Sequence, residues 1–237
     1  MAAVRRRFYT NEVRLGADTY RVIHPVRPIV HAPMHETGWG VEMYVNKAAT
    51  VDFALAWWLA ARSPHSLVYL PLRQSPDCEE RSWYCGRILD LVLAHHDLAF
   101  PPSRWKEVRA RLRPTGIQQV ALPERPFRVF DAPAHYLRKS RDHVRYTVAA
   151  DTLFLTSSQH GYELDGETVM ELLDDAPATL ATRPDKHTCA EIDLGRWHTR
   201  SGQGQRRDTP LRLHVVCCNQ HWLKVRSAGT SAPAAPR

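Results

Sequence analysis

Residues 48–72 read AATVDFALAWWLAARSPHSLVYLPL, and this stretch decides the expected fold class. Its first part predicts a helix over residues 48–62, because four apolar residues recur on one helical face: Val51, Leu55, Trp58 and Leu59. Pro64 ends this helix, since the residue before a proline disfavours helical backbone. The short apolar run 66–72 that follows is typical of a buried strand. A helix that leads directly into a strand indicates a sheet with helices packed on it.

Helical and strand patterns continue to alternate on both sides of this stretch. Residues 1–46 contain three prolines and short β-like runs, which indicate strands and loops. Further along, the patterns predict helices over 77–95, 103–113, 134–144 and 167–175, and strands over 117–122, 127–131, 151–156 and 211–216. The segment 183–210 is polar and is expected to form loops.

These elements predict an α/β or α+β fold with a mixed central sheet and flanking helices. We expect residues 1–226 to form a single main domain, since no repeat or clear linker divides them. Residues 227–237 read SAGTSAPAAPR and lack core-forming side chains, so they are expected to form a disordered C-terminal tail.

The positive charge of the chain consists almost entirely of arginine. The 237 residues carry a formal net charge of +7, and 27 of the 32 basic residues are Arg. Guanidinium groups match phosphate oxygens in pairs, so this charge favours a phosphate-bearing partner, DNA or RNA above all. The alternative is the codon bias of a GC-rich genome, which raises Arg, Ala and Pro throughout a chain without any binding role.

The distribution of apolar residues argues against a membrane protein. No apolar run approaches the roughly 20 residues that a membrane helix needs. The N-terminus contains basic residues, but no apolar segment of a secretory signal follows them. We therefore expect a cytoplasmic protein with no membrane partner.

Two basic segments are the predicted nucleic-acid-binding residues. The first contributes Arg104, Lys106, Arg109 and Arg113, and the second contributes Arg138, Lys139 and Arg141. Trp105 and Tyr136 lie beside these clusters and are expected to stack on bases. The alternative interpretation of both segments is an ordinary solvated helix face.

A group of histidines and cysteines near the C-terminus is a candidate metal site, with zinc as the expected ion. The predicted ligands are His187, Cys189, Cys218 and His221. Nitrogen and sulfur ligands suit zinc, and Cys218 and His221 have an ordinary chelate spacing. Cys217 and Cys218 are adjacent, so on a strand only one of them faces such a site. The alternative is a buried strand whose thiols act as small apolar groups.

Two polar loops follow predicted strands and are candidates for a small-molecule pocket. One loop is 73–75 and the other is 157–161. Helix N-termini after strands offer free N–H groups to anions. In this hypothesis His160 acts as a base, and Ser157 acts as a nucleophile or a phosphate ligand. Asp131, at the end of the predicted strand 127–131, is the third candidate catalytic residue.

Three functions from different classes remain open at this stage. The first is a nucleic-acid-binding or nucleic-acid-processing protein that uses its Arg-rich surface. The second is an enzyme for a phosphate-bearing small molecule, with a pocket at the strand-end loops. The third is a non-catalytic structural or partner-binding protein. Whether the protein is an enzyme is left undecided by the sequence, as is its oligomeric state.

Overall fold

The computed structural model describes residues 4–38, 40–75, 86–127, 142–196 and 210–218. A seven-stranded mixed sheet has the strand order β7-β1-β2-β5-β6-β9-β8. Its strands are β1 (Arg5–Leu15), β2 (Asp18–Pro25), β5 (Ser66–Leu70), β6 (Asp90–His95), β7 (Pro114–Ala121), β8 (Arg145–Ala149) and β9 (Thr152–Ser157). The pairs β2–β5 and β6–β9 are parallel, and the other pairs are antiparallel.

A smaller sheet of four strands has the order β10-β11-β4-β3. It contains β3 (Met34–Thr37), β4 (Gly40–Val45), β10 (Cys189–Arg196) and β11 (Pro210–Cys217). The pair β11–β4 is parallel, and the other two pairs are antiparallel. The expected mixed α/β fold is therefore confirmed, with two sheets in one compact domain.

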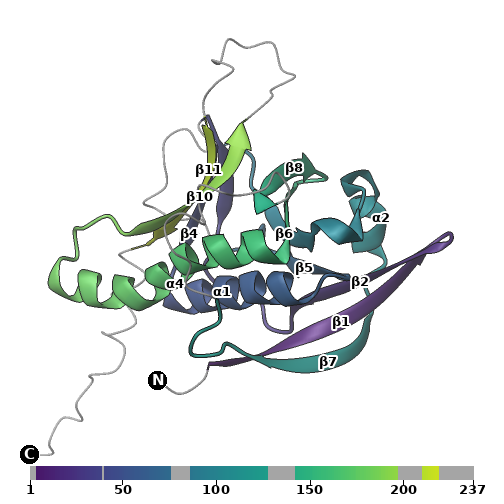
Figure 1. Cartoon of the computed structure of the whole chain (residues 1–237), viewed down its shortest axis with the longest axis horizontal. Coiled ribbons are helices and arrows are strands. Elements are labelled where there is room, and N and C mark those ends of the chain that lie inside the picture. Colours follow the sequence, from purple (N-terminus) through teal and green to yellow (C-terminus); the bar gives the residue numbers. More distant parts are fainter. Residues whose placement is uncertain (1–3, 39, 76–85, 128–141, 197–209, 219–237) are drawn as a thin grey trace, which may run out of the picture.

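Helices cover the two faces of the large sheet unequally. The long helices α1 (Lys47–Arg62) and α4 (Gln159–Thr182) lie side by side on one face, as Figure 1 shows. Between them and both sheets lies the main core, which contains the fully buried Trp57 and Tyr162. On the other face, the short helix α2 (Trp105–Ala110) encloses a second core around Trp105. The short 3-10 helices η1 (His96–Leu98) and η2 (Pro102–Arg104) precede α2.

Local sequence explains where α1 begins and how it is fixed. The side chain of Asn46 caps the helix by accepting a hydrogen bond from the backbone N–H of Ala49 at 2.9 Å. Helix α1 ends at Arg62, as predicted from Pro64. The indole N–H of Trp57 donates to the carbonyl of Tyr162 at 2.8 Å, which joins α1 to α4. Of the two adjacent tryptophans of α1, Trp57 is thus fully buried, and Trp58 is only partly buried.

Three predictions of secondary structure were wrong. Residues 90–95, expected to be helical, form the interior strand β6, which is buried on both faces. Polar residues 189–196, expected to be loop, form β10. Helix α4 spans 24 residues, far beyond the expected 167–175. A strand buried on both faces has no alternating pattern, so its apolar run resembles a buried helix.

The predicted helix 103–113 is shorter in the structure, where η2 leads into α2 and the helix ends at Ala110, and the described residues 86–89 of the predicted helix 77–95 are not helical. The remaining expectations were met or lie outside the described residues. The strands predicted at 66–72, 117–122, 151–156 and 211–216 correspond to β5, β7, β9 and β11. Most of the predicted strand 127–131, most of the predicted helix 134–144 and the whole tail 227–237 lie outside the described residues. Among the described residues, no helix combines the length and the apolar character that crossing a membrane requires.

Candidate functional site

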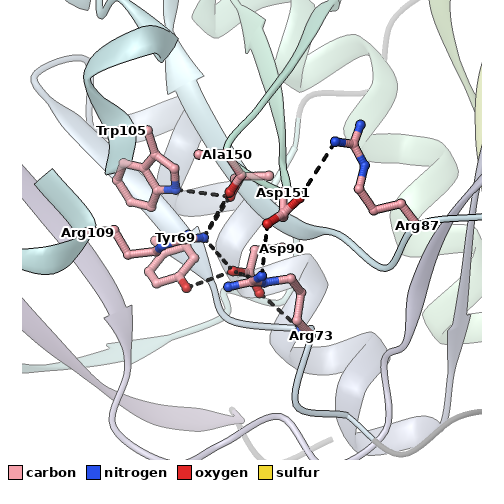
Figure 2. Close-up of polar contacts among 9 residues, drawn as sticks. Tyr69, Arg73, Arg87, Asp90, Trp105, Arg109, Ala150 and Asp151 are labelled. Atoms are coloured by element: carbon pink, nitrogen blue, oxygen red, sulfur yellow. Dashed lines mark hydrogen bonds and ion pairs between the residues drawn. The ribbon is translucent and has the colours of Figure 1, made fainter. Parts of the chain in front are cut away.

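Asp90 is the centre of the densest polar cluster in the described part of the chain. Its carboxylate is 2% exposed. It accepts hydrogen bonds from the Tyr69 hydroxyl at 3.1 Å, from the backbone N–H and Nε of Arg73 at 3.0 Å each, and from Arg109 at 3.2 Å. Figure 2 shows these side chains converging from β5, α2 and the start of β6. Burial and the adjacent Asp90 carboxylate both raise the pKa of Tyr69, so this phenol stays protonated.

A chain of ion pairs extends this cluster across the sheet edge. Arg73 also pairs with Asp151 at 3.2 Å, and Asp151 lies 3.6 Å from Arg87. Arg87 in turn pairs with Glu36 at 3.2 Å. Together with Asp90 and Arg109, three guanidinium groups face three carboxylates. The three positive and three negative charges balance, so this cluster presents no net charge to a ligand. Its ion pairs link α2, the β8–β9 turn and β3.

The structure changes the interpretation of the first predicted basic segment. Arg109 is engaged with Asp90, and Arg104 pairs with Asp18 at 2.6 Å. Trp105 is fully buried, and its indole N–H donates to the Thr152 hydroxyl at 3.0 Å. The expectation that Trp105 stacks on bases was therefore wrong.

The remaining members of the predicted basic set fall into two groups. Lys106 and Arg113 are exposed on or just after α2. Arg138, Lys139 and Arg141, together with the neighbouring Tyr136, lie outside the described residues. The contacts of Arg104 and Arg109 join residues far apart in sequence, so no local pattern reveals them.

The two strand-end loops lie at opposite edges of the sheet. Loop 73–75 follows β5, and loop 157–161 follows β9. Because β5 is antiparallel to β6 and β6 is parallel to β9, the carboxyl ends of β5 and β9 point in opposite directions. The two loops therefore do not line one shared pocket, and a ligand site at either loop alone stays a prediction. In the first loop, the buried Ser75 hydroxyl donates to the carbonyl of Ile29 at 3.1 Å, which is a structural contact.

The loop after β9 is a tightly packed helix start. Ser158 caps α4 by accepting from the Gly161 N–H at 3.0 Å, and it donates to Asp142 at 2.6 Å. A Cβ on Gly161 would lie 2.1 Å from the Ser157 hydroxyl oxygen, so only glycine fits this position. Ser157 is 1% exposed, and its hydroxyl has no hydrogen-bond partner among the described residues.

A second histidine, His95, contacts this loop from the end of β6. The backbone N–H of Gln159 donates to Nε2 of His95 at 3.0 Å, and Nδ1 lies 3.3 Å from Asp97. His160 begins α4 and is half-buried. Among the described residues, no hydrogen bond joins the Ser157 hydroxyl to a histidine side chain. The arrangement lacks the nucleophile–base contact that covalent catalysis uses. The third predicted catalytic residue, Asp131, lies outside the described residues.

A row of side chains crosses the large sheet on the face that carries α2. The strand pairing aligns Ile117 of β7 with Tyr9 of β1, and Tyr9 with His24 of β2. The rings of Tyr9 and His24 are 5.4 Å apart, and those of His24 and Tyr69 are 6.2 Å apart. Trp105 packs on Tyr69 with ring centroids 5.0 Å apart, so α2 covers this end of the row.

The other end of the row is exposed. Ile117 is 50% exposed, Tyr9 and His24 are half-buried, and Arg5, Arg7 and Gln119 alternate with them as exposed side chains. We call these six residues the open sheet face: Arg5, Arg7, Tyr9, His24, Ile117 and Gln119. Burial lowers the pKa of His24, so it is mainly uncharged at neutral pH.

Acidic residues are absent from the open sheet face. In the described strands β1, β2 and β7, the acids are Glu12 and Asp18. Glu12 has the strand parity of Phe8, which places it on the opposite face of β1. Asp18 is paired with Arg104 at the far end of the hairpin. This surface was not among the sites predicted from the sequence, although the alternation of Arg5, Arg7 and Tyr9 is a signal for a shared face.

A second cluster lies on the outer face of the small sheet. His187, Cys189 and His214 each bring one ligand atom into a group in which all three atoms lie within 4.8 Å of one another. Two of the four predicted metal ligands, His187 and Cys189, are therefore brought together. The third member is His214 rather than Cys218, and His221 lies outside the described residues. Cys218 is buried beside Tyr44 and Val216, with Cys189 packed against this group.

Cys217, the last residue of β11, and Cys218, which follows it, have different environments, as the alternation of side chains along a strand predicts. Cys217 faces the main core, whereas Cys218 belongs to the outer group. Burial raises the pKa of Cys217 to about 12, so this thiol acts as an apolar core group. Burial also raises the pKa of Cys189 and lowers that of His214.

Comparisons with known proteins give no relative for this chain. No family model matches it, and neither the curated proteins nor the solved structures include a significant match.

Proposed function

We propose that this protein binds single-stranded nucleic acid, RNA or DNA, on the open sheet face. The observation that carries the proposal is the row formed by the exposed Ile117 and the half-buried Tyr9 and His24, which lies beside the exposed Arg5 and Arg7. Aromatic side chains on an exposed surface stack on unpaired bases, and neighbouring arginines contact the phosphates.

Charge supports a polyanion in preference to a protein segment. The chain carries a formal net charge of +7, and the acids of the three strands lie off the open sheet face or are paired. A single strand is favoured over a duplex because paired bases do not expose their faces for stacking. The cytoplasmic location expected from the sequence belongs to the same proposal.

Fluorescence anisotropy with labelled single-stranded oligonucleotides tests this function. We expect both an oligo-uridine and an oligo-thymidine strand to bind, and a duplex of the same length to bind less tightly. Tyr9→Ala removes one stacking ring and is expected to cost about 1–3 kcal/mol of binding free energy. Tyr9→Phe keeps the ring and is expected to bind like the unmodified protein. Equal affinities for Tyr9→Ala and Tyr9→Phe would refute stacking on the open sheet face.

A further inference from the structure

The register of the small sheet brings two potential metal ligands to its outer face. Cys189 of β10 pairs with Val216 of β11, and Glu191 pairs with His214. Residues two apart on a strand share a face, so Cys189 and His214 are diagonal neighbours on the face turned away from the core. The core-facing residues of the same strands are Ala190, Ile192, Leu213 and Val215.

His187 completes the group from the segment just before β10. Its Nε2 lies 3.2 Å from Nε2 of His214, with the two ring planes inclined by 47°. Two nitrogens that bind one zinc ion tetrahedrally, each at about 2.0–2.1 Å, lie about 3.3 Å apart. The spacing of the two imidazoles therefore suits a shared ion, and the Cys189 sulfur lies within 4.8 Å of both nitrogens.

The charges around the group favour a cation. In the strand register, His214 lies opposite Glu191 of β10 on one side and Glu42 of β4 on the other, and both carboxylates act electrostatically on it. Glu191 also contacts Arg212, whereas Glu42 accepts the hydroxyl of Tyr44 at 2.6 Å. His187 is exposed and the other two ligands are half-buried, so an ion from solution can reach them.

We propose that His187, Cys189 and His214 form a binding site for a transition-metal ion of the zinc type. Two imidazole nitrogens and one thiolate are ligands that zinc prefers, and three protein ligands leave the fourth position for water or a further group. Binding requires the thiol of Cys189 to release its proton. This site is on a different sheet from the open sheet face, and the proposal is independent of the nucleic-acid function.

Cobalt is a suitable probe, because Co²⁺ replaces zinc in such sites and gives visible absorption. The full chain, purified in the presence of a non-thiol reductant and stripped of metal, is titrated with Co²⁺ and then with Zn²⁺. We expect one equivalent of Co²⁺ to produce the strong bands of a tetrahedral ion together with a thiolate-to-cobalt charge-transfer band. Zn²⁺ is expected to displace it and to raise the melting temperature.

Single substitutions show whether the bound ion is at the proposed site. Cys189→Ser is expected to abolish the charge-transfer band, and His214→Ala to weaken Co²⁺ binding by more than about 100-fold. Cys217→Ala and His143→Ala are the matched controls, since Cys217 faces the core and His143 is exposed elsewhere; both are expected to bind Co²⁺ normally.

A simple hydrogen bond between His187 and His214 is the competing explanation of their contact. It predicts no stoichiometric Co²⁺ binding, and that result would overturn the proposal. The proposal would also fail if Cys189→Ser kept the charge-transfer band or if His214→Ala left the affinity unchanged. Thermal melts without metal check that each variant is folded.

Discussion

At the scale of single residues, the buried Asp90 holds the ion pairs that anchor α2 and the loop after β5. Its buried carboxylate faces two guanidinium groups and a phenol. Asp90→Asn removes the negative charge and leaves Arg109 partly buried without its partner. Loss of one member of a buried ion pair costs about 3–5 kcal/mol, so we expect a loss of this size in urea denaturation.

Asp151→Asn is the matched control for this substitution. Asp151 belongs to the same chain of ion pairs but is 44% exposed, so its loss is expected to cost about 1 kcal/mol or less. Asp151 has a positive φ of 56°, which asparagine tolerates. If the two substitutions lowered the free energy of unfolding equally, the buried cluster would not hold α2 in the way described.

At the scale of elements, the start of α4 depends on an uncharged His95. Its Nε2 accepts the Gln159 N–H, and protonation would place a positive charge against the helix N-terminus. Burial lowers the pKa of His95; nearby His96 and His65 act in the same direction, and Asp97 opposes them.

The stability of the protein is expected to fall as the pH drops below the unfolded-state pKa of His95, about 6.5. In that range the unfolded chain binds a proton at His95 that the folded protein excludes, so ΔG of unfolding decreases until the lower folded-state pKa is reached. His95→Gln keeps an acceptor and does not titrate. Urea denaturation between about pH 5 and 7.5 gives the free energy of unfolding as a function of pH. This free energy should rise less steeply with pH in His95→Gln than in the wild type, and as steeply as in the wild type in the exposed control His143→Gln. Identical slopes for all three proteins would contradict the role of His95.

Local patterns predicted the elements whose signals are local. The helix predicted at 48–62 and the strands β5, β9 and β11 were confirmed because apolar spacing, short apolar runs and Pro64 mark them in the sequence. Strand β6 was missed because both of its faces are buried. The long α4 was underestimated because it contains Gly161, Gly166 and Pro177, which usually interrupt helices.

The candidate sites were harder to predict from the sequence than the helices and strands, because they are formed by contacts between residues far apart in the chain. His187 and Cys189 were found from composition, but His214 joined them only through the register of β10 with β11. Arg104 was taken for a binding residue because its partner Asp18 lies 86 positions away. The open sheet face depends on how far α2 extends over the sheet, which no local pattern specifies.

At the scale of the whole molecule, one face of the large sheet builds the main core, and part of the other face is the proposed binding surface. The pair α1 and α4 covers one face and builds the main core, and Figure 1 shows β1 and β7 extending beyond α2 on the molecule's periphery. Arg7 lies on the open sheet face, whereas Arg14 of the same strand has the opposite parity and is exposed on the other face. Because Arg7 and Arg14 are the same residue type on the same strand, substituting each of them compares the two faces of the sheet.

Binding of nucleic acid on the open sheet face is best tested by the salt dependence of oligonucleotide binding in the variants Arg7→Ala and Arg14→Ala. Each phosphate contact with a single strand contributes about −0.7 to the slope of log K against log salt concentration. We expect the unmodified protein to bind with a steep negative slope, Arg7→Ala to give a slope shallower by about 0.7, and Arg14→Ala to leave the slope unchanged. Equal slopes for Arg7→Ala and Arg14→Ala, or no binding of any single strand at about 50 mM salt, would contradict this expectation.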